Sequence, residues 1–161
     1  MKYFFKYNWM IREEWFSILK KNPHNEFIKQ RTGGVGSISY TLFHIITTEH
    51  NWICDLKGIP ILNLEFSSYQ NDLDKIIELS QTLHRDVKEY LEKWNDGLEY
   101  KELKLTVPSG VVHCTYGEAL RHIIVHEIHH IGQLSIWVRE IGMKPVSANL
   151  IHKGIMLNSS K

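Results

Sequence analysis

Apolar residues recur at helical spacing through four long segments of this 161-residue chain, and this period limits the possible folds more than any other feature. In the third segment, for example, Leu73, Ile76, Leu83 and Val87 fall on one face of a helix. The segments cover about residues 3–21, 39–56, 68–94 and 115–141. Each has one apolar stripe, so the stripes must meet in a shared core. The pattern therefore predicts an all-α fold, a four-helix bundle.

Turn and capping residues separate the four segments. Pro23 ends the first, and a capping box at Thr115–Glu118 begins the fourth. Before that box the period changes, because residues 103–108 and 111–114 alternate around a Ser-Gly turn in the way typical of a β-hairpin. The sequence has no internal repeat and no linker. We therefore predict a short hairpin between helices three and four, within a single domain of residues 1–161.

The charge balance and the short apolar runs exclude several classes of protein. Nineteen basic against eighteen acidic residues give a formal charge of +1, so no basic surface for nucleic acid or anionic membranes is expected. No apolar run approaches the roughly 18 residues that cross a bilayer, and the N-terminus lacks a signal-peptide pattern. The two cysteines, Cys54 and Cys114, make no disulfide framework. We expect a cytoplasmic protein with no nucleic-acid or membrane partner.

Histidines gather in the fourth predicted helix. The chain has 10 in all, and His122, His126, His129 and His130 are close together in sequence. His126 and His130 are one turn apart at the margin of the core stripe, roughly 5–6 Å between Cβ atoms, so both imidazoles can bind one ion. His122 and His129 point progressively away from the core. A lone histidine near an apolar face is more often a hydrogen-bonded core residue, so a metal site needs a third ligand.

His44 on the second predicted helix is the best candidate for that ligand. By helical rotation it lies at the margin of its own core stripe, as His126 and His130 do on theirs, whereas His50 faces away. Packed helices have axes about 8–10 Å apart, which allows the three side chains to meet. Three neutral nitrogen ligands leave one coordination position open, as in a catalytic metal site. The sequence thus predicts a divalent ion, and Zn, Ni or Fe suits histidine ligands best.

A second motif overlaps the same residues. The segment from His126 through Glu127 to His130 matches H-E-x-x-H, in which two histidines bind zinc and the glutamate is the base of a metallopeptidase. No third ligand follows at the expected spacing, and the chain offers no sheet to hold an extended peptide. We keep the zinc metallopeptidase as an alternative. We expect Glu127 to accept a hydrogen bond or to pair with a neighbouring helix rather than to act as a base.

Two segments resemble a known family. Residues 42–52 read Leu-Phe-His44-Ile-Ile-Thr-Thr-Glu49-His-Asn-Trp and resemble the H-x4-E-x2-W segment of the DinB/YfiT-like family. Residues 122–134 resemble that family's H-x3-H-x3-H-R-G-Q-[IL] helix, and the order of elements agrees along nearly the whole chain. One departure is Ile131, where the family often has an arginine, which puts in doubt any role of that arginine in binding an anionic substrate or thiol.

The resemblance implies a DinB-like four-helix bundle, usually a homodimer, with a divalent metal held by His44, His126 and His130. Some family members resemble metal-dependent thiol S-transferases that use bacillithiol, mycothiol or glutathione. The implied reaction joins a low-molecular-weight thiol, as co-substrate, to an electrophilic small molecule. The alternative is a non-catalytic, metal-bound stress-response dimer, because pocket residues also read as core residues. Beyond the metal ligands, the sequence leaves the catalytic and cofactor-binding residues unassigned.

Helical rotation places further residues near the ligands, where they can line a pocket or support the ligands from behind. These residues are Tyr40, Glu49, Asn51, Glu127 and Gln133. For Glu49, which falls inside an apolar stripe, we favour a structural hydrogen bond with a buried partner.

The fourth predicted helix also has apolar residues in addition to its core stripe. They are Leu120, Ile124, Ile128, Ile131, Ile136 and Val138. One bundle core cannot cover all of them, so we expect a homodimer that buries the remainder.

Overall fold

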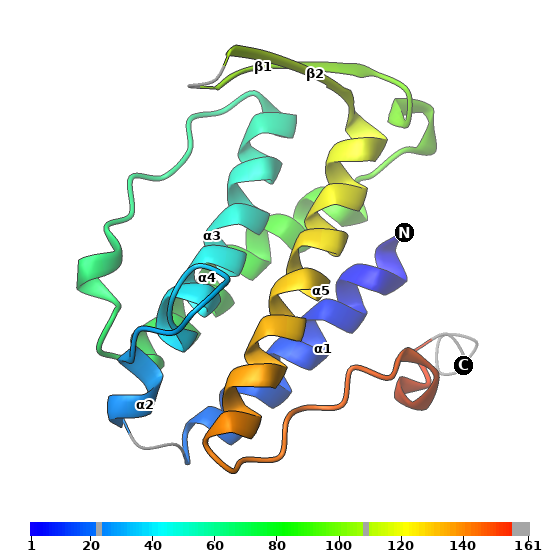
Figure 1. Ribbon diagram of the computed structural model, residues 1–161. Coiled ribbons are helices and arrows are strands. Elements are labelled where there is room, and N and C mark those ends of the chain that lie inside the picture. Colours follow the sequence, from blue (N-terminus) through cyan, green and yellow to red (C-terminus); the bar gives the residue numbers. More distant parts are fainter. Residues whose placement is uncertain (22–23, 108–109, 156–161) are drawn as a thin grey trace.

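Four long helices form a bundle, and a β-hairpin lies at one end of it (Figure 1). The computed structural model describes residues 1–21, 24–107 and 110–155. Its helices are α1 (Lys2–Leu19), α2 (His24–Ile28), α3 (Ile38–Lys57), α4 (Leu73–Glu92) and α5 (Tyr116–Glu140), and its strands are β1 (Glu102–Val107) and β2 (Gly110–Thr115). Short 3-10 turns lie at Phe66–Ser68, Asp96–Leu98 and Leu150–Lys153. The predicted all-α bundle, with a hairpin before its last long helix, is confirmed.

Helix α3 packs against both α4 and α5, while α1 packs against α5 and, less extensively, against α4. The core between the helices consists of large apolar side chains, among them Trp15, Leu42, Ile76 and Leu134, all with no exposed surface. Burying one such side chain contributes about 1.5–3 kcal/mol. Figure 1 shows α3 and α5 side by side, with α1 and α4 behind them. The two helices that carry the predicted ligands are therefore direct neighbours.

Capping side chains fix where these two helices begin. The Ser37 hydroxyl accepts a hydrogen bond from the Tyr40 backbone N–H at the start of α3. The predicted capping box of α5 is confirmed, because the Thr115 hydroxyl accepts from the Glu118 N–H and the Glu118 carboxylate accepts from the Thr115 N–H. Each such cap typically contributes about 1 kcal/mol. At its other end α3 stops at Gly58, whose φ of +67° is a left-handed conformation that glycine adopts without strain.

The structure differs from the predicted boundaries in two places. The third long helix, α4, begins at Leu73 rather than near residue 68, because the Asp72 side chain accepts from the Lys75 N–H and caps the helix there. The short helix α2 lies in a segment where no helix was predicted. The hairpin is confirmed in antiparallel register, with Leu103 opposite Cys114, but residues 108 and 109 of its predicted turn lie outside the described residues.

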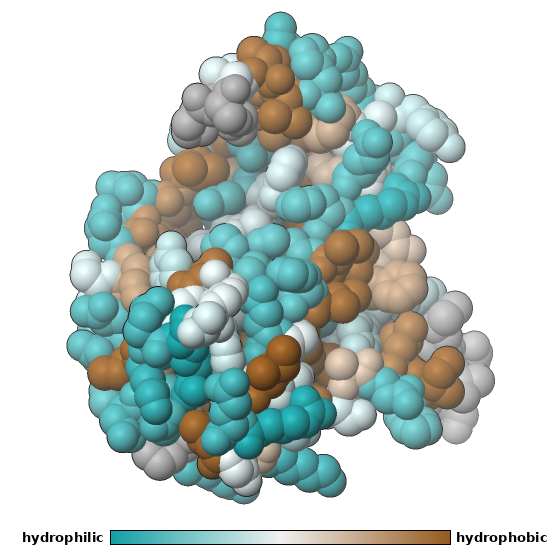
Figure 2. Space-filling view, viewed as in Figure 1, coloured by the Kyte–Doolittle hydropathy of each residue, from teal (hydrophilic) through white to brown (hydrophobic). Residues whose placement is uncertain are grey.

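Most of the apolar surface of α5 is covered within the chain itself. Leu120, Ile124, Ile131 and Val138 are at most 7% exposed, because α1 and α3 pack against α5 from two sides. The core therefore covers four of the six additional apolar residues. Ile128 and Ile136, with the neighbouring Val125, stay 42–63% exposed, and Figure 2 shows hydrophobic surface over this helix.

The described residues contain no helix that combines the length and the apolar character needed to cross a bilayer.

Candidate metal centre

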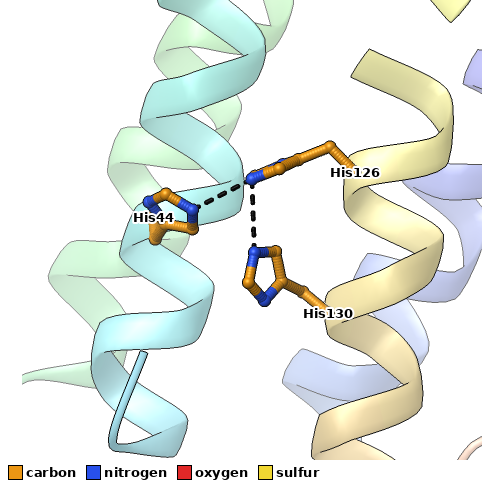
Figure 3. Close-up of side chains that lie close together, drawn as sticks. All are labelled: His44, His126 and His130. Atoms are coloured by element: carbon orange, nitrogen blue, oxygen red, sulfur yellow. Dashed lines mark hydrogen bonds between the residues drawn. The ribbon is translucent and has the colours of Figure 1, made fainter. Parts of the chain in front are cut away.

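Three imidazole rings converge between α3 and α5 (Figure 3). His44 projects from α3, and His126 and His130 project from successive turns of α5. The Nε2 atom of His126 lies 2.9 Å from Nε2 of His44 and 3.2 Å from Nε2 of His130. One ligand nitrogen from each of the three histidines lies within 4.8 Å of the other two. The structure thus brings together the three side chains that the sequence singled out.

This spacing is suitable for a single ion. A tetrahedral ion about 2.0–2.1 Å from each nitrogen separates its ligand atoms by about 3.3 Å. The two separations that involve His126, 2.9 and 3.2 Å, are close to that value, and the third pair of nitrogens lies within 4.8 Å. His130 is buried, whereas His44 and His126 are half-buried, so one side of the cluster faces outward. Three nitrogens with an open side can hold an ion and still leave a coordination position for a small molecule.

The surroundings keep the three rings neutral at neutral pH, as metal ligands must be. Burial, together with the neighbouring ring of His130, lowers the pKa of His44 to about 4. Burial and the surrounding histidines lower the pKa of His126 to about 3. Burial also lowers the pKa of His130, although a hydrogen bond from its ring opposes this shift. Protons therefore do not compete with a metal for these nitrogens near pH 7.

Hydrogen bonds on the outer ring nitrogens orient two of the rings. Nδ1 of His130 lies 2.7 Å from the carbonyl oxygen Oε1 of Gln133, and that oxygen can only accept, so Nδ1 carries the proton. Nε2 of the same ring then has a free lone pair directed into the cluster. Nδ1 of His44 similarly faces the Thr48 hydroxyl at 3.5 Å. Metal-binding histidines commonly have such partners, which fix the ring and its proton.

Behind the histidines lies a buried ion-pair network that joins three helices. The guanidinium of Arg12 on α1 donates from Nε and Nη2 to the Glu127 carboxylate, at 2.8 and 2.6 Å. It also donates from Nη1 to Glu49 on α3 at 2.8 Å, and the Trp9 indole N–H donates to the same carboxylate at 2.7 Å. All three charged side chains are at most 3% exposed. The predictions that Glu49 has a buried structural partner and that Glu127 pairs with a neighbouring helix are confirmed.

In this network the positive charge of Arg12 and the negative charges of Glu49 and Glu127 stabilise one another. Burial alone would lower the pKa of Arg12, but the carboxylates of Glu127 and Glu49 raise it above the usual value. Burial raises the pKa of Glu127, against the opposing effect of Arg12. Both oxygens of the Glu127 carboxylate accept hydrogen bonds from Arg12 on α1. The side chain that H-E-x-x-H would use as a base is therefore engaged elsewhere.

The role of Arg12 was not predicted from the sequence. A signal was present, because Phe5, Asn8, Arg12, Trp15 and Leu19 follow a 3-4-3-4 spacing, and all of them are buried. Charged and amide side chains on that stripe indicate a buried polar network, but not which partners it has.

The other predicted residues have different surroundings. Tyr40 lies one turn before His44 on α3, with 6.2 Å between the ring centroids. Asn51 is half-buried further along the same helix. His50 was predicted to face away from the core, which was wrong: it is 3% exposed, and its Nε2 lies 3.2 Å from Asp86 of α4. The rotation argument failed there because α3 is covered on two sides, by α4 as well as by α5.

Both cysteines are free thiols with modest reactivity. Cys54 is 1% exposed, and its sulfur lies 3.6 Å from Nδ1 of His50. Burial raises the pKa of Cys54, and burial together with Glu118 raises the pKa of Cys114 on β2. The protonated thiol is a poor nucleophile, so neither cysteine is suited to covalent catalysis.

Two cavities lie between elements of the bundle. One of about 340 Å³ is lined by Tyr40 together with Gln30, Ser37, Ser39 and Phe66, among others. A larger one of about 600 Å³ lies between α1 and α4. Among the described residues, His44, His126 and His130 line neither cavity. Tyr40, in the lining of the smaller cavity, has its ring 6.2 Å from that of His44.

Comparison with known proteins gives one family and two relatives. Residues 1–155 match the DinB family. The chain is 42% identical over 151 residues to "Uncharacterized protein YizA" of Bacillus subtilis (strain 168), an alignment that covers 94% of each chain. It is 24% identical over 149 residues to "Protein DinB" of the same organism, covering 86% of this chain and 84% of the relative. A helical bundle with a three-histidine cluster fits a metal-binding protein of this kind.

Proposed function

The chain belongs to the DinB family, and from that premise we propose that it is a metal-dependent thiol S-transferase with its ion held by His44, His126 and His130. The observation that carries the proposal is the convergence of three neutral imidazole nitrogens with one side of the cluster facing outward. A closed structural site would have four protein ligands, whereas three leave room for a substrate.

The reaction joins a small thiol to an electrophile. The sulfur forms a bond to the electrophilic carbon, the leaving group departs with its electron pair, and the thiol proton passes to solvent. A bound divalent ion would lower the pKa of a thiol at its open position, which favours the nucleophilic thiolate. The chain's own residues prepare this position: burial keeps the imidazoles neutral, and Gln133 and Thr48 orient the rings of His130 and His44.

The cavity beside Tyr40 is a suitable place for the electrophile. Its lining is aromatic, aliphatic and amide or hydroxyl in character, with no charged side chain among the lining residues described. An uncharged, partly aromatic molecule is compatible with such walls. Tyr40 lines this cavity, and its ring lies 6.2 Å from the ring of His44 between centroids.

Purified protein should conjugate a low-molecular-weight thiol to a model electrophile such as 1-chloro-2,4-dinitrobenzene, at a rate that requires metal. The screen should include bacillithiol, mycothiol, glutathione and coenzyme A, each with metal-loaded and chelator-treated protein. His130→Ala should abolish the metal-dependent rate because it removes one of three ligands. Product formation is followed by absorbance, with the uncatalysed reaction subtracted.

The rival proposal is a non-catalytic, metal-bound stress-response dimer. It gains support if none of these thiols gives a metal-dependent rate while the protein still binds its ion. Glu127 takes no part as a base in either proposal, since its carboxylate is bound by Arg12.

We also propose a homodimer, now on a smaller surface than the sequence suggested. The exposed residues Val125, Ile128 and Ile136 are apolar and lie on one helix. Light scattering at micromolar concentration should give about 38 kDa, which is twice the 19.0 kDa of one chain. Ile128→Glu should convert the dimer to a monomer, whereas Val111→Glu, a matched change on the hairpin, should not. A wild-type mass near 19.0 kDa would count against the dimer.

A cytoplasmic setting is part of the proposal. Low-molecular-weight thiols are kept reduced there, and the two cysteines of the chain are free.

A further inference from the structure

The loop before α3 closes over a side chain that contacts the proposed metal centre. Gly34, with a φ of +56°, approaches the Gln133 carboxamide so closely that a Cβ at position 34 would lie 2.5 Å from Oε1 and 3.0 Å from Cδ. The same Cβ would lie 3.1 Å from the ring of Trp137. Only a residue without a side chain allows this approach.

Gln133 is held on its other sides by two histidines. Its Oε1 lies 2.7 Å from Nδ1 of His130, and its Nε2 lies 2.9 Å from Nε2 of His129. The amide donates to His129 and its carbonyl accepts from His130, so the two bonds fix which end of the carboxamide faces each ring. The proton of His130 is thereby kept on Nδ1, and its Nε2 is left free to bind an ion.

The loop itself is tied down at both ends. The Arg31 backbone N–H donates to the Gly36 carbonyl at 2.5 Å, and its guanidinium donates to the Glu26 carboxylate of α2 at 2.7 Å. Arg31 also lies 3.6 Å from Glu140 at the end of α5. The backbone at Gly34 is therefore fixed over α5.

From these contacts we infer that Gly34 is a positioning residue of the metal centre, which acts through Gln133 to hold His130 in its metal-binding tautomer. This inference rests on the metal centre proposed above. This positioning role belongs to a loop that neither provides a metal ligand nor lines the histidine cluster.

A substitution at Gly34 should affect the site more than the fold. The closest atoms that a new Cβ would meet belong to the far end of a flexible side chain, so Gln133 can swing aside, whereas the Trp137 ring at 3.1 Å needs to move by only a few tenths of an ångström. Swinging aside breaks the hydrogen bond to His130. The backbone strain of a positive φ is a separate effect, and Gly33 provides the control: its φ is +80°, and nothing lies within 4 Å of a Cβ built there.

The test compares Gly34→Ala, Gly33→Ala, Gln133→Ala and the double variant Gly34→Ala/Gln133→Ala in the full chain. Affinity for Co(II) or Zn(II) is measured by chelator competition, and the His130 tautomer is read in metal-free protein by imidazole ¹⁵N NMR. Gly34→Ala and Gln133→Ala should each weaken metal affinity about 10- to 100-fold, the usual effect of losing such a partner. Gly33→Ala should stay within about twofold of wild type, with a melting temperature close to that of Gly34→Ala.

In the Gln133→Ala background, Gly34→Ala should cause no further loss of metal affinity, because the two changes remove the same contact. Additive losses would overturn the inference, as would an equal loss in Gly33→Ala or a wild-type Nδ1–H signal in Gly34→Ala. The tautomer readout needs neither metal nor thiol transfer. The inference can therefore fail while the proposed reaction stands, and the reverse is also possible.

Discussion

Arg12→Met should lower the free energy of unfolding by about 3–5 kcal/mol, the largest stability effect that we expect from one change outside the apolar core. The substitution keeps an unbranched chain of similar length but leaves Glu49 and Glu127 without their shared cation, and all three side chains are at most 3% exposed. Two unpaired carboxylates must then stay buried or take up protons. Chemical denaturation of metal-free protein measures the loss without contributions from a bound ion.

The matched control is Lys93→Met, which removes an equally short ion pair, with Glu89 at 2.6 Å, on the exposed side of α4. Its denaturation midpoint should hardly move, because water solvates both charges. Adding Glu49→Gln and Glu127→Gln to Arg12→Met should restore part of the lost stability, since the uncompensated charges are gone. An Arg12→Met protein within about 1 kcal/mol of wild type would show that the network contributes little to the fold.

His44→Ala should reduce the metal content from about one ion per chain to less than about a tenth. Losing a hydrogen-bond partner of a ligand commonly costs about 10- to 100-fold in affinity, and losing one of three ligands should cost more. Elemental analysis of protein purified without an affinity tag measures the content. Added metal should raise the melting temperature of the wild type but not of His44→Ala, because only a bound ligand stabilises the native state.

His122→Ala is the control, since His122 lies on the same helix as His126 and is exposed. It should keep its ion, with affinity changed by no more than a few-fold. Full metal content in His44→Ala together with metal loss in His129→Ala would show that the ligands had been assigned incorrectly.

The parts of this molecule that follow from local rules could be predicted from the sequence. Apolar spacing predicted the four long helices, and the Thr115–Glu118 box fixed the start of α5. The three-histidine cluster was predicted because His44, His126 and His130 occupy equivalent margins of their helices, and that rotation needs no knowledge of the fold. The start of α4 was predicted too early. Asp72 caps the helix only if its own backbone is extended, and apolar spacing does not show this.

Contacts between distant segments could not be predicted in the same way. The partners of Arg12 are 37 and 115 residues away, so its burial could be read from the stripe of α1 but its pairing could not. The approach of Gly34 to Gln133 depends on how a loop crosses a helix about a hundred residues later. His50 faced a second neighbouring helix that a single-stripe rotation ignores.

The buried thiol of Cys54 has a practical consequence for studying motion in this protein. The sulfur is sealed between α3 and α4, with His50 and Asp86 beside it, and it is 1% exposed. A maleimide can reach the sulfur only when α3 and α4 separate, so the labelling rate of Cys54 reports how often they do so. Cys114 on the hairpin is less covered, so we expect it to react without that separation and to serve as an internal reference in the same sample. The labelling rate of Cys54 relative to that of Cys114 therefore measures how often α3 and α4 separate, without an introduced cysteine.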